Sequence, residues 1–292
     1  MPNKIILVDG NSIINRAFYG LPLLTNKLGE FTNAGYGFLN MVLKLYYEEK
    51  PTHLAVAFDL PKPTFRHELF SEYKAKRKSM PNELRAQFVT LKNLLQKMGI
   101  NYYEKCGFEA DDILGTLAKK FENENFETII FSGDRDLLQM ASEKIRIFIP
   151  KSKKNSKSIE KYDEKIVFEK IGVTPKEFID VKALMGDKSD NIPGVPGVGE
   201  KSALKIIAEH KSIENALENL NRKKNLTSFE KKLCEHSQNA LFCKKLVTIN
   251  THVPIEINFD DAKATDLFNI DALQELKRLD LNGLINRFGA LC

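Results

Sequence analysis

The sequence predicts an α/β fold in which a mostly parallel central sheet is flanked by helices and followed by a helical region with a helix–hairpin–helix type motif. Two observations predict this class. Short apolar runs alternate with helical periodicities over the first half of the chain, and strands separated by helices favour a parallel sheet covered on both faces. Beyond about residue 160 the periodicity is almost wholly helical. We therefore expect two parts, residues 1–160 and residues 161–292.

The strands of the expected sheet are four short apolar runs, at residues 5–8, 54–58, 128–131 and 144–149. Helices are predicted where apolar residues recur every three or four positions, at residues 34–49, 83–98 and from 109 onward. The stretch 151–158 is rich in Lys and Ser and predicts a solvated loop. In the second part we expect helices at residues 174–185, 199–209, 212–220 and 228–246.

The composition is that of an ordinary globular protein, with 42% apolar and 28% charged residues. The net charge of +5 is small, so nucleic-acid binding does not follow from charge alone. Four widely spaced cysteines argue against a zinc site or a disulfide framework. The first apolar run is too short for a signal peptide, and no run approaches the ~20 apolar residues of a membrane helix. We therefore expect a soluble, cytoplasmic monomer.

Nine acidic residues stand where predicted strands end or helices begin or end. In parallel α/β sheets, side chains at the carboxyl ends of the strands meet at one edge. The repulsion among so many carboxylates would be large without cations, and hard divalent ions, Mg²⁺ above all, prefer oxygen ligands. Two ions about 4 Å apart would suit phosphoryl chemistry. The alternative is that each residue forms a turn or caps a helix. The nine are Asp9, Asp59, Glu109, Asp111, Asp112, Asp134, Asp136, Asp187 and Asp190.

Residues 60–82 form a basic segment with few apolar anchors. Lys74, Arg77 and Lys78 stand at i, i+3 and i+4, so on a helix they would share one cationic face. Tyr73 beside them would be a stacking platform for a base. A cationic face near a carboxylate cluster fits a phosphodiester held over metal ions. The alternative is a solvated surface helix, which is the usual meaning of a charge run.

A glycine-rich turn at residues 193–199 directly precedes a helix, and together they predict a helix–hairpin–helix turn over residues 193–209. Gly197 and Gly199 would let the backbone approach a phosphate, which the N–H groups of the next helix would bind. Lys201 adds a positive charge beside it. The alternative is a plain connection between two helices, punctuated by Gly and Pro.

Seven ordered motifs resemble the 5′-nuclease (flap endonuclease) family, most closely the N-terminal 5′→3′ exonuclease domain of bacterial DNA polymerase I. The resemblance runs over nearly the whole chain, to about Leu291. The motifs are Val8-Asp9-Gly10-Asn11-Ser12, Ala57-Phe58-Asp59, Pro63-Thr64-Phe65-Arg66, Tyr73-Lys74-Ala75-x-Arg77-Lys78, Glu109-Ala110-Asp111-Asp112, Gly133-Asp134-Arg135-Asp136 and Gly186-Asp187-x-x-Asp190-Asn191.

The resemblance implies a PIN-like nuclease fold and a role for each motif. Two Mg²⁺ ions are implied, for which Mn²⁺ could substitute. The first would be held by Asp9, Asp59, Glu109, Asp111 and Asp112, and the second by Asp134, Asp136, Asp187 and Asp190. Lys74 and Arg77 would be catalytic, because they would polarise the scissile phosphate or stabilise its charge in the transition state. DNA would be contacted by Asn11, Arg16, Tyr73, Lys78, Gly197, Gly199 and Lys201, with K⁺ at the glycine turn.

The expected function is that of a divalent-metal-dependent, structure-specific 5′→3′ exonuclease and 5′-flap endonuclease that leaves 5′-phosphates in replication and repair. Its partners would be DNA with a 5′ end, nick or 5′ flap, RNA primer–DNA hybrids, and a linked or separate DNA polymerase. Three rival functions are a toxin-type ribonuclease, a DNA-binding module without catalysis and a phosphatase. Cleavage of flapped DNA in Mg²⁺ separates the expected function from all three.

Overall fold

The computed structural model describes residues 3–153 and 156–289. Its centre is a six-stranded sheet in the order β3-β2-β1-β4-β5-β6. Strands β1 to β5 run parallel, and β6 is antiparallel to β5, which confirms the predicted mostly parallel sheet. The strands are β1 (Lys4–Asp9), β2 (His53–Ala57), β3 (Asn101–Tyr103), β4 (Glu127–Phe131), β5 (Ile145–Lys153) and β6 (Ser156–Tyr162).

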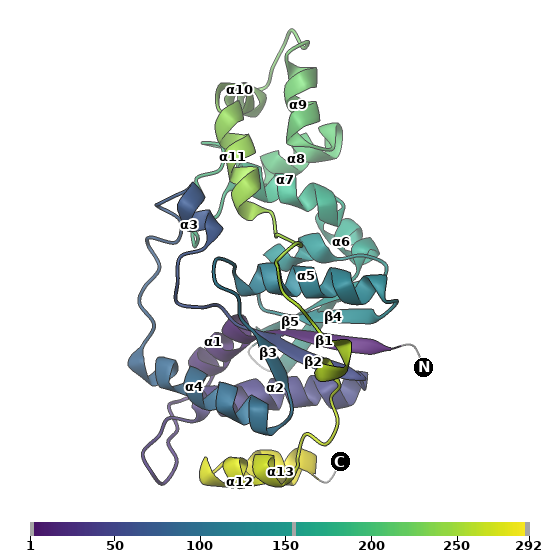
Figure 1. Ribbon diagram of the computed structural model, residues 1–292. Coiled ribbons are helices and arrows are strands. Elements are labelled where there is room, and N and C mark those ends of the chain that lie inside the picture. The colour runs from purple at the N-terminus through teal and green to yellow at the C-terminus, as the bar shows by residue number, and fades with distance from the viewer. Residues whose placement is uncertain (1–2, 154–155, 290–292) are drawn as a thin grey trace.

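Helices cover both faces of the sheet and then build a helical tip on one side of it (Figure 1). The first part contains α1 (Gly10–Gly20), α2 (Asn33–Glu49), α3 (Phe65–Leu69), α4 (Asn82–Lys97), α5 (Ala110–Asn123) and the 3-10 helix η1 (Asp136–Met140). The tip and its base contain α6 (Glu164–Ile171), α7 (Pro175–Met185), α8 (Glu200–His210), α9 (Ile213–Leu220), α10 (Ser228–Glu235) and α11 (Ser237–Val247). The chain ends with η2 (Phe259–Ala262), α12 (Ile270–Arg278) and α13 (Asn282–Phe288).

The side chains of β1 divide the core into two layers. Ile5 and Leu7 pack with α5 on one face, whereas Ile6 and Val8 pack with α2 and α4 on the other. All four side chains are fully buried. Successive side chains of a strand point to opposite faces, so a continuous apolar run is what a strand covered on both sides requires.

The loop predicted for residues 151–158 is wrong. β5 continues to Lys153 and β6 begins at Ser156, and the two strands pair in an antiparallel register that places Ser152 opposite Lys157. Residues 154–155 of that prediction lie outside the described residues. β6 is an edge strand, and lysines on an edge strand discourage pairing with a further chain. The Lys-rich composition of residues 151–158 is therefore compatible with an edge strand as well as with a loop.

The helix predicted over residues 228–246 is two helices. α10 ends at Glu235 and α11 begins at Ser237, because His236 between them leaves the helical conformation with φ −114° and ψ 28°. Helices α1, α3, α6, α12 and α13 and strand β3 had no counterpart in the predicted elements. Most of them are short, and a short element gives little periodicity to detect.

Helices α12 and α13 belong spatially to the α/β body, although they fall in the range predicted for the helical part. They pack on α4 and α2, beneath the sheet in Figure 1 and far from α9 and α10. Leu276 and Leu284 are fully buried there, in the same apolar layer as Leu91 and Leu95 of α4. The chain thus returns from the tip to the body before it ends.

In the described part of the chain, none of the helices combines the length and apolar character that crossing a membrane requires. Cys106, Cys234 and Cys243 are free thiols. Cys292 lies outside the described residues.

Candidate active site

A cavity of about 600 Å³ opens beyond the carboxyl ends of the parallel strands β1, β2 and β4. Seven of the nine predicted carboxylates line it, and Asp112 and Asp187 are the two that do not. Residues from five separate stretches of sequence therefore meet here, as the strand topology requires. The seven are Asp9, Asp59, Glu109, Asp111, Asp134, Asp136 and Asp190.

Asp9 both caps a helix and lines the cavity. Its Oδ1 accepts the backbone N–H of Ser12 at 2.9 Å, which caps α1, and its Oδ2 accepts the Ser132 hydroxyl at 2.6 Å. The side chain is buried. Burial raises the pKa of Asp9 to about 7, and repulsion from Asp59 and Asp134 adds to the rise. Capping and metal binding are therefore compatible roles for this carboxylate.

Asp59 and Asp111 face the same space from the end of β2 and from the first turn of α5. The Oδ1 of Asp59 accepts the backbone N–H of Ala110 at 2.7 Å. Burial raises the pKa of both carboxyl groups, and that of Asp111 lies well above its ordinary range because Asp9 and Asp134 repel it as well. Since like charges this close oppose one another's ionisation, the arrangement favours a bound cation.

Asp134 and Asp136 form a second acidic group, next to Lys182 of α7. The Nζ of Lys182 lies 2.7 Å from Oδ1 of Asp136 and 2.9 Å from Oδ2 of Asp187. Burial raises the pKa of Asp136 to about 6, and repulsion from Asp134 adds to it, while Lys182 opposes the rise. For Asp187 burial is outweighed by hydrogen bonds from Ser189 and Lys182, which hold its pKa at about 2. A buried ammonium thus stands between two carboxylates predicted to hold the second ion.

Asp112 points away from the cavity and is engaged by Arg66. The guanidinium holds both carboxylate oxygens, at 2.7 Å and 2.8 Å, and Asp112 also accepts the backbone N–H groups of Glu109 and Asn250. Arg66 donates further to the carbonyl of Leu246 at 2.8 Å. Asp112 is fully buried, so these contacts fill its acceptor positions. Its geometry suits the positioning of α5 against the chain after α11 and gives no support to a role as metal ligand.

The basic segment does not form a helix on which Lys74, Arg77 and Lys78 would share one face. Only α3 is helical, and Lys74 lies in a turn with φ +56°. Tyr73 is 3% exposed, and its hydroxyl lies 3.0 Å from Oε2 of Glu109 and 3.2 Å from Oδ2 of Asp190. The stacking role predicted for Tyr73 is corrected accordingly, because its ring offers no free face to a base.

Lys74, Arg77 and Lys78 nevertheless line the acidic cavity. The Nζ of Lys74 lies 2.6 Å from Oε1 of Glu109, and Nη2 of Arg77 lies 2.5 Å from Oδ1 of Asp190. Half of the Arg77 side chain is exposed. Cations and carboxylates therefore share one cavity, although a turn and not a helix face brings the cations there.

Asn11 and Arg16 line different cavities. Asn11 lines the acidic cavity, and its Oδ1 accepts the backbone N–H of Asp59 at 2.9 Å. Arg16 lines a separate cavity of about 440 Å³ together with Tyr36 and Lys44. Five positions along a helix correspond to a rotation of roughly 140°, which carries Arg16 away from the carboxylates.

The glycine turn joins α7 to α8, and both helices are present where a helix–hairpin–helix turn needs them. Gly186 and Gly194 have φ of +71° and +63°, and a Cβ on Gly194 would lie 2.5 Å from the nitrogen of Gly186. Gly199 is the N-cap of α8 and provides no side-chain cap. Gly197, Gly199 and Lys201 are exposed, and they lie outside the acidic cavity.

Three groups at the site were not among the predicted site residues: Arg66, Ser132 and Lys182. Arg66 could have been found, because it stands within one of the recognised motifs. Ser132 carried a weaker signal, its place directly after a strand. Lys182 carried none, since a lysine in the middle of a predicted helix is ordinary.

Two family models match the chain. Residues 4–172 match the 5′–3′ exonuclease, N-terminal resolvase-like domain, and residues 173–269 match the 5′–3′ exonuclease, C-terminal SAM fold. DNA polymerase I of Bacillus caldotenax is 48% identical over 261 residues, and that of Bacillus subtilis (strain 168) is 45% identical over 286 residues. The alignments cover 89% and 98% of this chain but 29% and 32% of the two relatives, so the chain spans about a third of their length.

Among solved structures, the bacteriophage T5 flap endonuclease, in a pseudo-enzyme–product complex with DNA and metal ions, matches with a TM-score of 0.69 and 22% identity. The match covers 95% of this chain and 100% of that one, and it supports the fold. With both halves matched by models of one family, and with carboxylates and cations gathered at the sheet edge, the chain belongs to the 5′–3′ exonuclease family and is a nuclease.

Proposed function

We propose that this nuclease acts on DNA with a 5′ end, a nick or a 5′ flap, and that it hydrolyses phosphodiesters there to leave 5′-phosphates. The observation that carries the proposal is the cavity at the carboxyl ends of the strands. Seven carboxylates and the cations of Lys74, Arg77 and Lys78 line the same space of about 600 Å³. A cavity of mixed charge suits a phosphodiester bound over metal ions better than it suits a neutral small molecule.

The donor set fits hard divalent cations. Every acidic group of the cavity offers oxygen ligands. Burial and repulsion raise the pKa of four of them, Asp9, Asp59, Asp111 and Asp136. A bound cation would therefore lower the free-energy cost of ionising these carboxylates. We propose Mg²⁺, with Mn²⁺ as a substitute. When bound, such ions would supply Lewis-acid catalysis at the phosphate and acidify water. One ion would lie among Asp9, Asp59, Glu109 and Asp111, and the second among Asp134, Asp136, Asp187 and Asp190.

Lys74 and Arg77 would exchange partners when DNA enters. Each now pairs with a carboxylate, Glu109 and Asp190 respectively, and these carboxylates would turn to the cations. The ammonium and guanidinium groups would then contact the scissile phosphate and stabilise the charge that develops on it. Arg77 is the more exposed of the two, so we expect it to meet the phosphate first.

The glycine turn would hold the duplex beyond the cut. The first N–H groups of α8 have no side-chain acceptor from Gly199, and a helix N-terminus favours an anion. Gly197 and Lys201 are exposed beside it and would face the sugar–phosphate backbone. We include K⁺ at this turn in the proposal, with main-chain carbonyl groups as its ligands.

The family supports a proposal for the biological setting. The relatives named DNA polymerase I suggest that RNA primer–DNA hybrids are substrates and that a polymerase, linked or separate, works beside this nuclease. We propose a cytoplasmic location and a monomer, in which one chain supplies all the cavity residues. Binding would depend on DNA shape and backbone charge, so it would weaken as salt is raised.

The test is cleavage of a 5′-labelled flap duplex by the purified chain in Mg²⁺ and in EDTA, beside Asp134→Ala. We expect Mg²⁺-dependent release of short 5′ fragments and a loss on the order of 100-fold in the variant. Asp260→Ala is the matched control, because Asp260 is an exposed carboxylate paired with Lys263 outside the cavity. Full activity of a folded Asp134→Ala protein, or tight flap binding without turnover in any divalent ion, contradicts the proposal.

A further inference from the structure

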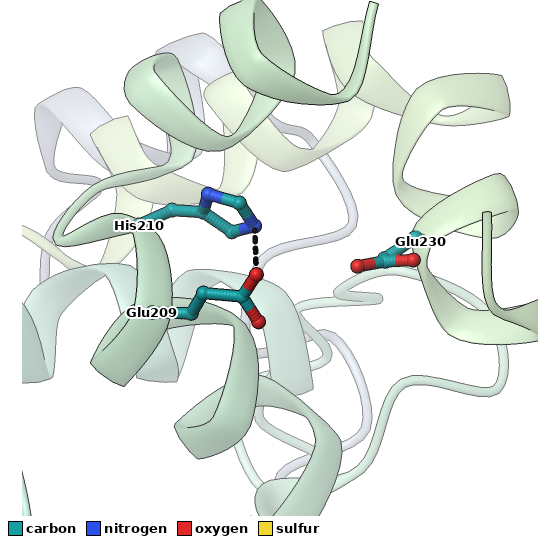
Figure 2. Close-up of side chains that lie close together, drawn as sticks. All are labelled: Glu209, His210 and Glu230. Atoms are coloured by element: carbon teal, nitrogen blue, oxygen red, sulfur yellow. Dashed lines mark ion pairs between the residues drawn. The ribbon is translucent and has the colours of Figure 1, made fainter. Parts of the chain in front are cut away.

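A second cluster of possible metal ligands lies in the helical tip, apart from the acidic cavity. Glu209 and His210 end α8, and Glu230 lies in the first turn of α10 (Figure 2). One ligand atom from each residue lies within 4.8 Å of the other two. Among the residues that the structure describes, no other set of acidic, His or Cys side chains meets this condition. The cluster does not belong to the nuclease site, because none of its members lines that cavity.

His210 points an unsatisfied nitrogen into this cluster. The residue is 8% exposed, and within the described part of the chain its Nε2 is buried with no hydrogen-bond partner. The nearest acidic atom is Oε1 of Glu209, at 3.7 Å, which is too far for a hydrogen bond. A buried polar atom without a hydrogen-bond partner destabilises the folded state. A ligand that binds Nε2 would remove this cost.

The other ring nitrogen of His210 has a partner in α9. Nδ1 of His210 lies 3.3 Å from the amide nitrogen of Asn219 in α9. In this orientation the amide nitrogen donates to Nδ1, which leaves the proton of a neutral ring on Nε2. Turning the amide so that its oxygen accepts from Nδ1–H would move that proton and free the lone pair of Nε2. A partner on one nitrogen that fixes which atom is free is the usual support of a histidine ligand.

A cation already stands beside the cluster. The Nζ of Lys223 lies 2.8 Å from Oε1 of Glu230. The other oxygen of Glu230, Oε2, accepts the backbone N–H of Thr227 at 2.7 Å, so both carboxylate oxygens are held in place. Lys223 is partly exposed and lies in the link between α9 and α10, so it can withdraw to water.

We propose that Glu209, His210 and Glu230 bind a divalent transition-metal ion, with Zn²⁺ as the best match. One imidazole and two carboxylates suit Zn²⁺, whereas Mg²⁺ prefers oxygen ligands alone. The ion would take the place of the Lys223 ammonium and would complete its coordination with water. It would join the end of α8, the helix that follows the glycine turn, to the start of α10.

The experiment is a Zn²⁺ titration of the full chain in excess Mg²⁺, which occupies the carboxylates of the nuclease cavity. Long-range ¹H–¹⁵N spectra report each of the five histidines separately. We expect the Nε2 signal of His210, assigned with His210→Asn, to move to the metal-bound position at one equivalent. His252→Asn is the matched control, since His252 is an exposed histidine outside the cluster.

Three variants sharpen the result. Glu209→Gln changes an exposed residue and keeps the fold, and it should weaken Zn²⁺ binding about 10-fold or more. Glu230→Gln should weaken it further, and Lys223→Met should strengthen it, because the competing cation is gone. No movement of the His210 signal at a large excess of Zn²⁺, or binding that is equal in Glu209→Gln, Lys223→Met and the parent chain, overturns the proposal. Flap cleavage in Mg²⁺ should stay at the parent level in Glu209→Gln.

Discussion

Replacing Asp9 by Asn isolates the electrostatic cost of gathering carboxylates in the acidic cavity. The introduced amide has nearly the shape of the carboxylate. Its oxygen can still accept the N–H of Ser12 and cap α1, and its nitrogen can donate to the hydroxyl of Ser132. The substitution therefore removes a charge while the local hydrogen bonds are kept.

The magnitude follows from the pKa of Asp9, which burial, with repulsion from Asp59 and Asp134, raises from 3.8 to about 7. The folded state thus holds this proton more tightly than the unfolded state. Between about pH 4 and pH 7 unfolding releases the proton, so stability falls as pH rises through this window. At about 1.4 kcal/mol per pKa unit, the raised pKa of Asp9 lowers the free energy of unfolding by about 4 kcal/mol at pH 8 and by less than half of that at pH 5.

The assay is equilibrium unfolding in guanidinium chloride with EDTA at pH 5 and at pH 8. We expect Asp9→Asn to be more stable than the parent chain at pH 8, with a gain that shrinks at pH 5. In Mg²⁺ the order should reverse, because the chain that keeps the carboxylate binds the cation more tightly and gains more stability from it. Asp163→Asn is the matched control: Asp163 caps α6 through the N–H of Ile166 but lies outside the cavity.

Two results would refute this reasoning. A variant less stable than the parent in EDTA at pH 8 would mean that Asp9 acts chiefly through its hydrogen bonds and that repulsion in the cavity is small. A gain that is the same at pH 5 and at pH 8 would mean that the proton of Asp9 is not linked to folding.

Three further outcomes are expected. Arg66→Met leaves Asp112 buried and uncompensated, so it should lower the free energy of unfolding by about 3–5 kcal/mol, and Asp112→Asn in the same background should recover part of the loss in urea unfolding. Gly194→Ala forces a Cβ against backbone at φ +63° and should destabilise by about 1–3 kcal/mol, whereas an equal or higher melting temperature would contradict the close approach. Lys182→Met should raise the pKa of Asp136 above its value of about 6 in ¹³C carboxyl titrations without metal, and an unchanged pKa would show that the ammonium does not govern it.

The position of the acidic cavity could be predicted because it depends on chain topology. Asp9, Asp59 and Asp134 each follow an apolar run long enough for a buried strand, and parallel strands separated by helices bring their carboxyl ends to one edge. No knowledge of side-chain packing was needed for this step. The two-sided burial of β1 followed in the same way from its uninterrupted apolar sequence.

The separate roles of neighbouring residues could not be predicted. Asp111 faces the cavity while Asp112 is held by Arg66, because one step along a helix turns the side chain by about 100° and a partner 46 positions away occupies the second direction. The same holds for Tyr73, whose spacing in the sequence suggested an exposed face but whose hydroxyl reaches Glu109.

By itself, then, the sequence determined which chemistry the chain brings: strand ends rich in carboxylates, a basic segment, and a glycine turn before a helix. Only the tertiary structure decided which of these charged groups repel one another and which form an ion pair with a partner of opposite charge. Lys182 between Asp136 and Asp187 is an example. The tertiary structure alone also left Nε2 of His210 buried without a hydrogen-bond partner. The physical reason is that patterns along a chain record local geometry and burial, whereas the pairing of charges depends on side chains that only folding brings within a few ångströms.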